Sequence, residues 1–303
     1  MEVPVGIVCV NFNGGAYLEE FLRSLDRVTR PSWRLVLVDN ASWDGSGGMA
    51  RAVLGERATV LSRHDNLGYA AGVNAGVRHC IEQGYEQVVL INPDTVVRPD
   101  FLYYLVQAAE PTTLVTPKVL LYGTTRLDDT VGTFDWERGI WRDWIFRKPE
   151  SHILQARQTV DMASMCCMLA PTSVFASAGF LDESYFMYYE DFDFVHRAQA
   201  AGYEVVLEPR SVIEHRKSAA SGGGSPFFTY YTTRNRMHLV RQHVKNSRQF
   251  ALFLAYFLPG RVIKTLPLLL RLDTARVRAM WAGVADYFKG VTGPSRYLPH
   301  PRE

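Results

Sequence analysis

The sequence predicts an α/β protein with a mostly parallel central sheet flanked by helices, followed by a C-terminal helical appendage. Over residues 1–110, apolar runs rich in β-branched residues alternate with stretches of helical spacing. Such runs are typical of strands covered on both faces, and the alternation favours right-handed crossovers between parallel strands. After about residue 226 the pattern changes to long apolar stretches with basic flanks, which predicts separate helices.

The elements of the N-terminal part can be assigned in order from their spacing. The clearest predicted helix places Leu18, Phe21, Leu22 and Leu25 on one face. The predicted order is strand 5–12, helix 16–25, strand 34–40, strand 58–66, helix 68–84 and strand 87–94.

The middle of the chain is less regular. Residues 115–165 mix short strands with turns and tryptophans, and 136–150 reads as an exposed loop. A buried strand and short helix follow at 160–180, and then a helix that Gly202 ends before a last strand.

Composition and charge exclude several classes of protein. The chain has 303 residues with a net charge of +2 and no dense basic stripe, so nucleic acid is not expected as a partner. Its four cysteines lack metal-ligand spacing and are expected to be buried free thiols in a reducing compartment. The N-terminus has no basic segment before an apolar one, so we expect a cytoplasmic location rather than secretion.

Polar side chains recur where the predicted N-terminal strands end. The carboxyl ends of parallel strands meet at one edge of a sheet, where ligands bind. A carboxylate there, such as Asp94, can hold a divalent cation whose other ligands are water and phosphate oxygens. The alternative is that these are ordinary polar loops. The residues are Asn11, Asn13, Asp39, Asn40, Asp65, Asn66, Asn92 and Asp94.

A glycine stripe marks the predicted helix at 68–84. Gly68, Gly72 and Gly76 recur every four residues and therefore lie on one face. Asn66 and Asn74 offer hydrogen bonds beside them, and a helix N-terminus favours a phosphate group. The alternative is close packing of the helix on the sheet.

The stretch "MYYEDFDF" at 187–194 places carboxylates among aromatic residues. In a helix that begins near Glu190, Asp193 and Arg197 stand four apart and can pair. Glu190 and Asp191 are then available, and an ionised carboxylate can deprotonate a hydroxyl nucleophile. The alternative is that all three acids only begin the helix. His215 follows a later strand as a second candidate metal ligand or phosphate contact.

Taken together over about residues 5–220, these motifs resemble the inverting GT-A glycosyltransferases of family 2, in particular their rhamnosyltransferase-like branch. The stretches that carry the resemblance are "VNFNGGAYLEEFLRSL", "LVDNASWDGS", "NLGYAAGVNAG", "INPDT", "GFLDESYFMYYEDFDFVHRAQAAGY" and "VIEH". The resemblance implies a GT-A catalytic domain at 1–225, with a nucleotide-sugar half at about 1–110 and an acceptor half at about 111–225. An amphipathic helical region follows at 226–303.

The resemblance also implies roles for individual residues. Asp39 would hold the base of a nucleotide sugar, and Asp191 would be the general base, with Glu190 beside it. Asp94 would bind Mg²⁺ or Mn²⁺ with His215 nearby, although the DxD-type motif reads Asn92-Pro93-Asp94 here and lacks one acid. The full set of expected donor-binding residues is Asn11, Asn13, Asp39, Asn66, Gly68, Asn74, Asn92, Asp94 and Arg234.

The implied activity is inverting transfer of a sugar to a hydroxyl group. The donor would be dTDP-rhamnose, or a UDP-hexose, and the acceptor a bacterial surface glycan or a polyprenyl-linked sugar. Two alternatives stand beside it. A sugar nucleotidyltransferase would open with a Gly-rich loop followed by Arg and Pro, which "VNFNGGAYLEE" lacks. A non-catalytic nucleotide- or glycan-binding protein would not need Asp191. The sequence leaves a homo-oligomer open.

The apolar tail at 251–272 raises the question of membrane contact. Pro259, Arg261, Lys264 and Pro267 interrupt it, whereas about 20 uninterrupted apolar residues are needed to cross a bilayer. The basic flanks favour helices that lie on the inner face of the cell membrane, and the alternative is an amphipathic cap on the domain.

Overall fold

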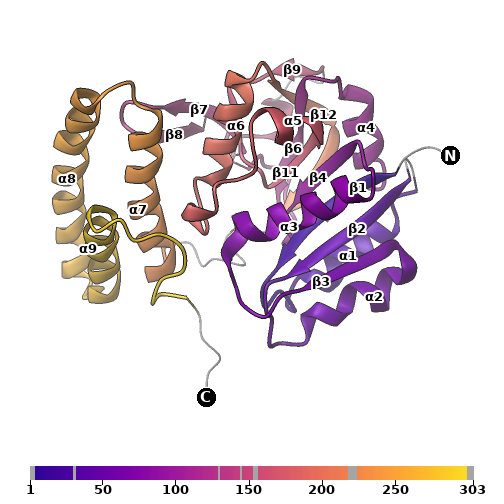
Figure 1. Ribbon diagram of the computed structural model, residues 1–303, viewed down its shortest axis with the longest axis horizontal. Coiled ribbons are helices and arrows are strands. Elements are labelled where there is room, and N and C mark those ends of the chain that lie inside the picture. The colour runs from indigo at the N-terminus through magenta and orange to yellow at the C-terminus, as the bar shows by residue number, and fades with distance from the viewer. Residues whose placement is uncertain are drawn as a thin grey trace.

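The computed structural model describes residues 4–298 except 30–31, 129, 144, 153–155 and 218–223. Trp144, in the predicted loop at 136–150, therefore lies outside the described residues. The predicted α/β architecture is confirmed, with helices on both faces of a central sheet and a helical layer at the C-terminus (Figure 1).

The N-terminal part forms the parallel half of the sheet. Its strands are β1 (Val5–Asn11), β2 (Trp33–Asp39), β3 (Ala58–Ser62) and β4 (Gln87–Ile91), in the order β3-β2-β1-β4. Every pair among them is parallel, and the last residue pair of β1 and β2 is Asn11 with Asp39. The parallel arrangement therefore brings two of the expected site residues side by side.

Helices cover both faces of these strands and explain their continuous apolar sequences. α1 (Leu18–Asp26), α2 (Met49–Leu54) and α4 (Phe101–Ala108) pack on one face, whose core includes Ile7 and Cys9 of β1. α3 (Gly68–Glu82) covers the other face, where it meets Val8 and Val10. All four cysteines are buried free thiols, as the sequence predicted.

The second half makes the complete sheet mixed. β11 (Cys167–Pro171) lies antiparallel between β4 and β6 (Thr113–Leu121), and β6 pairs in parallel with β12 (Glu204–His215). β5 (Thr95–Val97) and β9 (Gln158–Thr159) each pair antiparallel with β12. The parallel order predicted from strand–helix alternation thus ends where the chain returns through β11.

A smaller antiparallel sheet and two helices complete this half. The sheet consists of β10 (Met162–Ala163), β7 (Val131–Asp135) and β8 (Ile140–Asp143). β8 lies within the expected loop at 136–150, so that expectation was partly wrong: cross-strand pairing, including Phe134 with Trp141, orders it. The helices are α5 (Ser173–Ser177) and α6 (Glu190–Ala200).

The C-terminal layer consists of α7 (Pro226–His243), α8 (Ser247–Leu270) and α9 (Thr274–Phe288) (Figure 1, left). α7 begins with Ser225 as N-cap and Pro226 in the first turn, where its missing N–H costs nothing. The residues that interrupt the apolar tail do not end the helix, because α8 continues through Pro259 and Pro267. Both prolines are exposed, so the carbonyls they leave unpaired are accessible to water.

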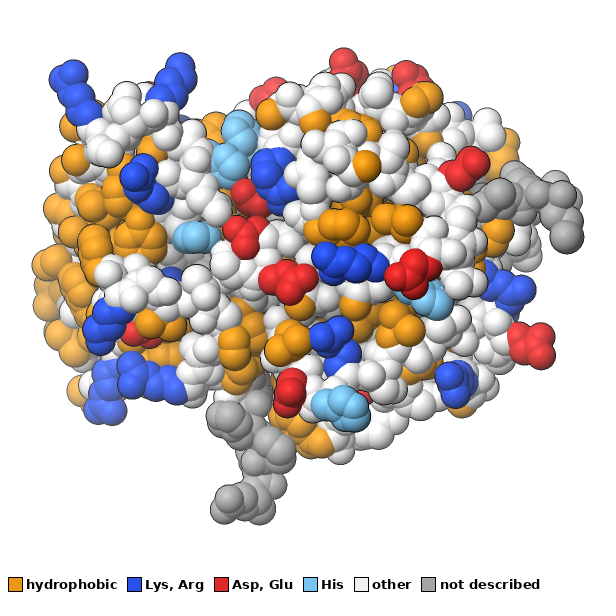
Figure 2. All heavy atoms as spheres, in the orientation of Figure 1, with side chains coloured by type: hydrophobic (Ala, Val, Ile, Leu, Met, Phe, Trp, Pro, Cys, Tyr) orange, Lys and Arg blue, Asp and Glu red, His pale blue; other side chains and the backbone are white. Residues whose placement is uncertain are grey.

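The outer face of α8 carries exposed apolar side chains. Leu252, Ile263 and Leu270 retain 63%, 72% and 77% of their accessible surface. Figure 2 shows hydrophobic side chains gathered over this end of the molecule, with basic side chains at its margins. α8 is also the one helix among the described residues that is long and apolar enough to cross a membrane, judged by length and composition alone.

Candidate active site

A buried polar cluster lies where β1 and β2 end. The Asn11 amide Nδ2 donates to Asp39 Oδ1 at 2.8 Å and to the hydroxyls of Ser46 and Ser42 at 2.8 and 3.0 Å. The Ser42 hydroxyl donates to the same Asp39 oxygen at 2.6 Å. The carboxylate of Asp39 is therefore held in one orientation at the edge of the sheet by these hydrogen bonds.

Two further asparagines shape the neighbouring loops. Asn13 adopts a left-handed backbone with φ of 52°, and its Oδ1 accepts the Trp43 N–H at 2.9 Å. Asn66 Oδ1 accepts the Gly68 N–H at 2.9 Å, and Asn40 donates to the Gly68 carbonyl at the same distance. The contacts to Gly68 fix the conformation of the chain where it enters α3.

The glycine stripe of α3 packs against protein. A Cβ at Gly72 or Gly76 would lie 2.7 Å from Val10 or 2.4 Å from Val8, so both glycines serve close helix–sheet packing. Gly68, with φ of +91°, faces the Phe186 carbonyl, which a Cβ would approach to 2.3 Å. Of the two readings that the sequence left open, close packing accounts for these three positions.

Asn74 is also used inside the protein. Its Nδ2 donates to the Leu181 carbonyl and the Glu183 carboxylate, both at 2.9 Å, while its Oδ1 accepts the Leu181 N–H at 3.0 Å. Asn74 therefore ties α3 to the turn that precedes α6. These contacts do not connect it with Asn11, Asp39 or Asp94.

Asp94 and His215 meet at the end of β4 and β12. His215 Nε2 lies 3.4 Å from Asp94 Oδ1, and its Nδ1 lies 2.6 Å from Asp128 Oδ2. Asp94 is 5% exposed, and its Oδ1 has no hydrogen-bond donor. A nearly buried carboxylate oxygen with no donor is suited to a cation.

The surroundings of His215 fit a divalent metal. Burial opposes its protonation, but the Cys166 sulfur and the carboxylates of Asp128 and Asp94 outweigh burial and raise its pKa. With a metal present, Asp128 would instead orient the neutral imidazole through Nδ1, as carboxylates behind histidine ligands do. Within the described residues no group of three His, Cys, Asp or Glu side chains could hold an ion alone. Asp94 and His215 would supply two ligands, and diphosphate oxygens and water the rest.

Glu190 and Asp191 begin α6 in an apolar environment. Burial and the neighbouring Asp191 raise the pKa of Glu190 well above its usual range, which favours its neutral form. Burial also raises the pKa of Asp191 to about 6, although backbone hydrogen bonds from Phe192 and Met165 oppose the rise. At neutral pH, Asp191 is therefore an ionised carboxylate of increased basicity. The predicted pair of Asp193 with Arg197 is confirmed at 2.7 Å.

The short segment of Met165 and Cys166 contacts both the start of α6 and the chain close to Asp94, a candidate metal ligand. The Cys166 carbonyl accepts the Asn92 N–H at 3.0 Å, next to Asp94, while the Met165 backbone contacts Asp191. Tyr69 of α3 donates weakly to the Met165 carbonyl at 3.4 Å, and burial together with the nearby carboxyl groups of α6 raises the pKa of its phenol. Residues 94 and 191 therefore border the same short segment, Met165 and Cys166, directly before β11.

Comparison with known proteins identifies the family. A profile described as Glycosyl transferase family 2 matches residues 6–175, more than half of the chain. This chain belongs to glycosyl transferase family 2. The predicted resemblance to that family is thus confirmed, and the chain is a glycosyltransferase.

Relatives and solved structures agree with this assignment. An N-acetylglucosaminyl-diphospho-decaprenol L-rhamnosyltransferase of Mycobacterium tuberculosis is 27% identical over 244 residues, which cover 71% of this chain and 77% of the relative. The fold is similar to GalNAc-T7 with UDP, GalNAc and Mn²⁺ (TM-score 0.60, 15% identity), covering 76% of this chain and 47% of that one. It is also similar to the Pyrobaculum calidifontis mannosyltransferase PcManGT with GDP-Man and Mn²⁺ (TM-score 0.56, 14% identity; coverage 95% and 88%). These similarities show the GT-A fold.

The turn before α6 in this family 2 protein is strained. Phe186, Tyr188 and Tyr189 have φ of 66°, 69° and 75°, a region that bulky L-residues rarely adopt. Such strain persists only where the surroundings over-determine the backbone, and it concentrates at functional sites. Here the turn sets the direction in which Glu190 and Asp191 leave the backbone.

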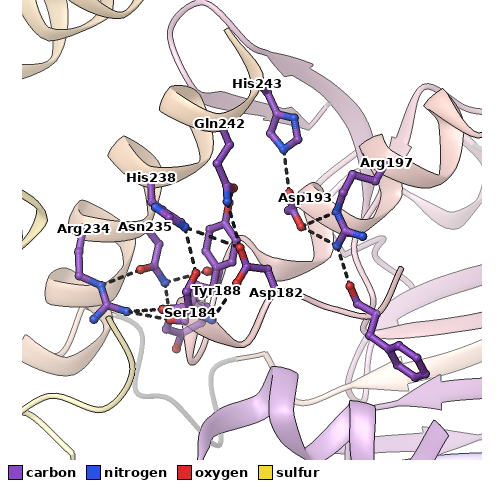
Figure 3. Close-up of polar contacts among 12 residues, drawn as sticks. Asp182, Ser184, Tyr188, Asp193, Arg197, Arg234, Asn235, His238, Gln242 and His243 are labelled. Carbon is purple, nitrogen blue, oxygen red and sulfur yellow. Dashed lines mark hydrogen bonds and ion pairs between the residues drawn. The ribbon is translucent and has the colours of Figure 1, made fainter. Parts of the chain in front are cut away.

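Two side chains of α7 hold this turn in place. Asn235 Nδ2 donates to the carbonyls of Tyr185, Met187 and Tyr188 at 2.9, 2.8 and 3.0 Å. Arg234 is 2% exposed and donates to the Tyr185 carbonyl at 2.9 Å and to the Asn235 Oδ1. Figure 3 shows both reaching from α7 toward the turn. Arg234, one of the expected donor-binding residues, thus binds protein acceptors.

We predict that Asn235→Ala lowers kcat about 100-fold, because small displacements of reacting groups have costs of this size. The free energy of unfolding should fall by about 1–3 kcal/mol, since buried carbonyls lose their donor. Steady-state kinetics and denaturant unfolding test this. A positioning role predicts an unchanged KM for the donor, and Thr229→Ala on the same helix should change neither quantity. An Asn235→Ala enzyme with normal kcat would contradict the assignment.

Four contributors to the site were missed from the sequence. Asp128 belongs to no recognisable motif, and only the folding of the chain brings it into contact with His215. Ser42 and Ser46 lie in "ASWDGSGG", the loop after the predicted strand 34–40, and sequence reasoning assigned these two serines no role. Asn235 stands beside the predicted Arg234 in "YYTTRNR", and that neighbour was the available signal.

Proposed function

We propose that this glycosyltransferase works with inversion, moving a sugar from a nucleoside diphosphate donor to a hydroxyl of a lipid-linked glycan. The observation that carries the proposal is Asp191, a half-buried carboxylate with a pKa of about 6 that directly follows a strained turn. Its backbone contact, Met165, adjoins Cys166, whose carbonyl accepts the N–H of Asn92 close to Asp94. A non-catalytic binding protein has no use for a carboxylate of raised basicity in this position.

The reaction is a single displacement. Asp191 accepts the proton of the acceptor hydroxyl while that oxygen forms a bond to the anomeric carbon. The bond from the anomeric carbon to the diphosphate breaks, and the nucleoside diphosphate leaves with the electron pair. Because Glu190 is neutral, it adds no second negative charge beside the base Asp191. Bound Mg²⁺ or Mn²⁺ at Asp94 and His215 would offset the charge of the leaving diphosphate.

The donor site would follow the carboxyl ends of β1, β2 and β4. Asp39, oriented by Asn11, would accept the N–H of a pyrimidine base, and Asn13, Asn66 and Asn92 border the same edge. dTDP-rhamnose is our first choice of donor and a UDP-hexose the second. The name of the Mycobacterium tuberculosis relative supports both the rhamnosyl group and a lipid-diphosphate acceptor. The nucleotide and Mn²⁺ named for GalNAc-T7 and PcManGT support the donor class and the metal.

The proposed arrangement places the catalytic domain at 1–225, with the donor half at 1–110 and the acceptor half at 111–225. The helical region at 226–303 would lie on the inner face of the cytoplasmic membrane, where lipid-linked acceptors are available. The exposed apolar face of α8 supports this placement.

A donor panel tests the proposed function. We expect one pyrimidine-diphospho-sugar, dTDP-rhamnose first, to raise the melting temperature in the presence of Mg²⁺ or Mn²⁺ and to be hydrolysed slowly without acceptor. EDTA should abolish both effects. Sugar-1-phosphates with nucleoside triphosphates serve as the comparison, since a nucleotidyltransferase would respond to those instead. Absence of any response to nucleotide sugars would overturn the proposal.

A further inference from the structure

The outer face of α8 carries a continuous apolar stripe (Figure 2). Its members recur at intervals of three and four residues, so they lie along one side of the helix over about 27 Å. Apart from the proline, each retains between 49% and 77% of its accessible surface. α8 contains no Asp or Glu, and by the same spacing Arg261 and Lys264 lie away from the stripe. The stripe consists of Leu252, Tyr256, Pro259, Ile263, Leu266 and Leu270.

The opposite side of α8 is held by the protein. Phe253 and Phe257 are 1% exposed and belong to one buried cluster with Val284 of α9. The Trp281 Nε1 of α9 donates to the Thr265 Oγ1 at 3.1 Å. A helix that crossed a bilayer would give up these contacts and would carry its two central charges into hydrocarbon, which is unfavourable. α8 therefore presents one apolar face to the outside, as a helix that lies flat in a membrane interface does.

The helical region and the catalytic domain carry opposite net charges. Residues 226–303 contain 13 Lys and Arg against 3 Asp and Glu, a net charge of +10. Residues 1–225 contain 20 Lys and Arg against 28 Asp and Glu, a net charge of −8. The exposed Arg248 precedes the stripe by one helical turn, and the exposed Arg271 directly follows it. The stripe is therefore bordered by positive charge, which attracts an anionic surface and repels a second copy of the same helical layer.

We propose that the stripe on α8 enters the headgroup region of an anionic lipid bilayer, with α8 parallel to the membrane and Arg248 and Arg271 on the lipid phosphates. This inference rests on the membrane placement in the proposed function and deepens it, because it names the lipid charge and the side chains that make the contact. Apolar burial supplies the part of the affinity that resists salt, and the basic side chains supply the part that salt removes. The charge of −8 keeps the catalytic domain off the same surface, so the protein binds in one orientation.

Co-sedimentation with vesicles, in the absence of substrates, tests the apolar contact. The protein should bind vesicles of phosphatidylcholine mixed with phosphatidylglycerol. Ile263→Gln/Leu266→Gln should weaken this binding at least about tenfold, since burial of even one such side chain contributes a factor of this size. The matched control Ile81→Gln/Tyr103→Gln removes apolar side chains that are 40% and 46% exposed on the catalytic domain, and it should bind like the unchanged protein. Normal binding by the α8 variant would overturn the proposal.

The same assay tests the lipid charge. Binding should fall at least about tenfold on vesicles of phosphatidylcholine alone, and also in about 1 M salt, where screening is nearly complete. Arg248→Gln/Arg271→Gln should cause a similar loss on the mixed vesicles, because each basic residue near an anionic surface contributes about fivefold. Arg51→Gln/Arg98→Gln removes the same charge from exposed positions of the catalytic domain and should have no effect. Equal binding to neutral and anionic vesicles would rule out the named partner.

Two other outcomes would overturn the inference. Protein that stays in cell membranes after extraction with alkaline carbonate would mean that α8 spans the bilayer. A dimer in solution that ignores vesicles, and that Ile263→Gln/Leu266→Gln makes monomeric, would mean that a second copy covers the stripe. The melting temperature of each variant should match that of the unchanged protein, because the replaced side chains are exposed.

Failure of this inference can be told from failure of the proposed function. Vesicle binding by a protein that uses no nucleotide sugar would leave the membrane contact standing and remove the transferase mechanism. Hydrolysis or transfer from a nucleotide sugar by a protein that ignores anionic vesicles would do the reverse.

Discussion

Asp191→Asn is expected to lower kcat by about 10²–10⁴-fold, the usual contribution of a general base. Asparagine has nearly the same shape and can keep the Phe192 N–H contact of 2.9 Å, but it cannot accept the acceptor's proton. The affinity for the donor should therefore be unchanged. Single-turnover transfer and donor titration measure the two quantities separately. Asp161→Asn, at an exposed position, is the control, and near-normal transfer by Asp191→Asn would remove the base from this mechanism.

The same residue makes activity depend on pH. Burial raises the pKa of Asp191 from 3.8 to about 6, so kcat/KM should rise with pH and level off above about 6. The residual activity of Asp191→Asn should not show this rise of kcat/KM with pH. A raised carboxyl pKa stabilises the fold when protonated, and that stabilisation is lost as pH increases from about 4 through 6. Asp191→Asn should therefore melt above the unchanged enzyme at pH 7 and alongside it near pH 3.

Asp94→Asn is expected to remove metal-dependent donor binding. The carboxylate offers a nearly buried oxygen without a donor, and an amide is a much weaker ligand for a hard cation. We expect the donor Kd to rise at least about 100-fold, and the remaining binding to be insensitive to EDTA. Mn²⁺ titration and calorimetry of the donor check this. The fold should not suffer, because a neutral side chain at a buried position lacks the cost of desolvating a charge.

Asp128→Asn provides a graded comparison for Asp94→Asn. Asp128 contacts His215 rather than the proposed metal, and losses behind a ligand usually cost about 10–100-fold in metal affinity. A larger effect at Asp128 than at Asp94 would be inconsistent with the assigned ligands.

The carboxyl ends of β1, β2 and β4 show where sequence reasoning succeeded. Asn11, Asp39 and Asp94 could be predicted there, since period and composition identify parallel strands and parallel strands end at one edge. The glycine stripe shows where that reasoning was ambiguous. Spacing places Gly72 and Gly76 on one face, but only the coordinates show that this face meets Val10 and Val8.

The helical region shows where sequence reasoning reached its limit. Arg234 stands among Thr, Asn and Arg in "YYTTRNR", a pattern that fits a ligand contact and a buried structural arginine equally well. The deciding contacts, to the carbonyls of Ser184 and Tyr185, span about fifty residues of chain. Asp128 was invisible for the same reason, because its partner His215 lies 87 residues further along the chain.

The local sequence was enough to predict the α/β class and the parallel N-terminal strands. It also predicted the acidic residues at the ends of strands and the start of a helix, because all of these follow from periodicity and neighbouring residues. The tertiary structure decided which of those acids are buried, which histidine and aspartates meet, and which helix holds the strained turn before Asp191. Burial and long-range hydrogen bonds are properties of the packed chain, and they set the pKa of Asp191 and the unpaired oxygen of Asp94. The residue types were encoded locally, whereas their chemical states arise only where distant segments come together.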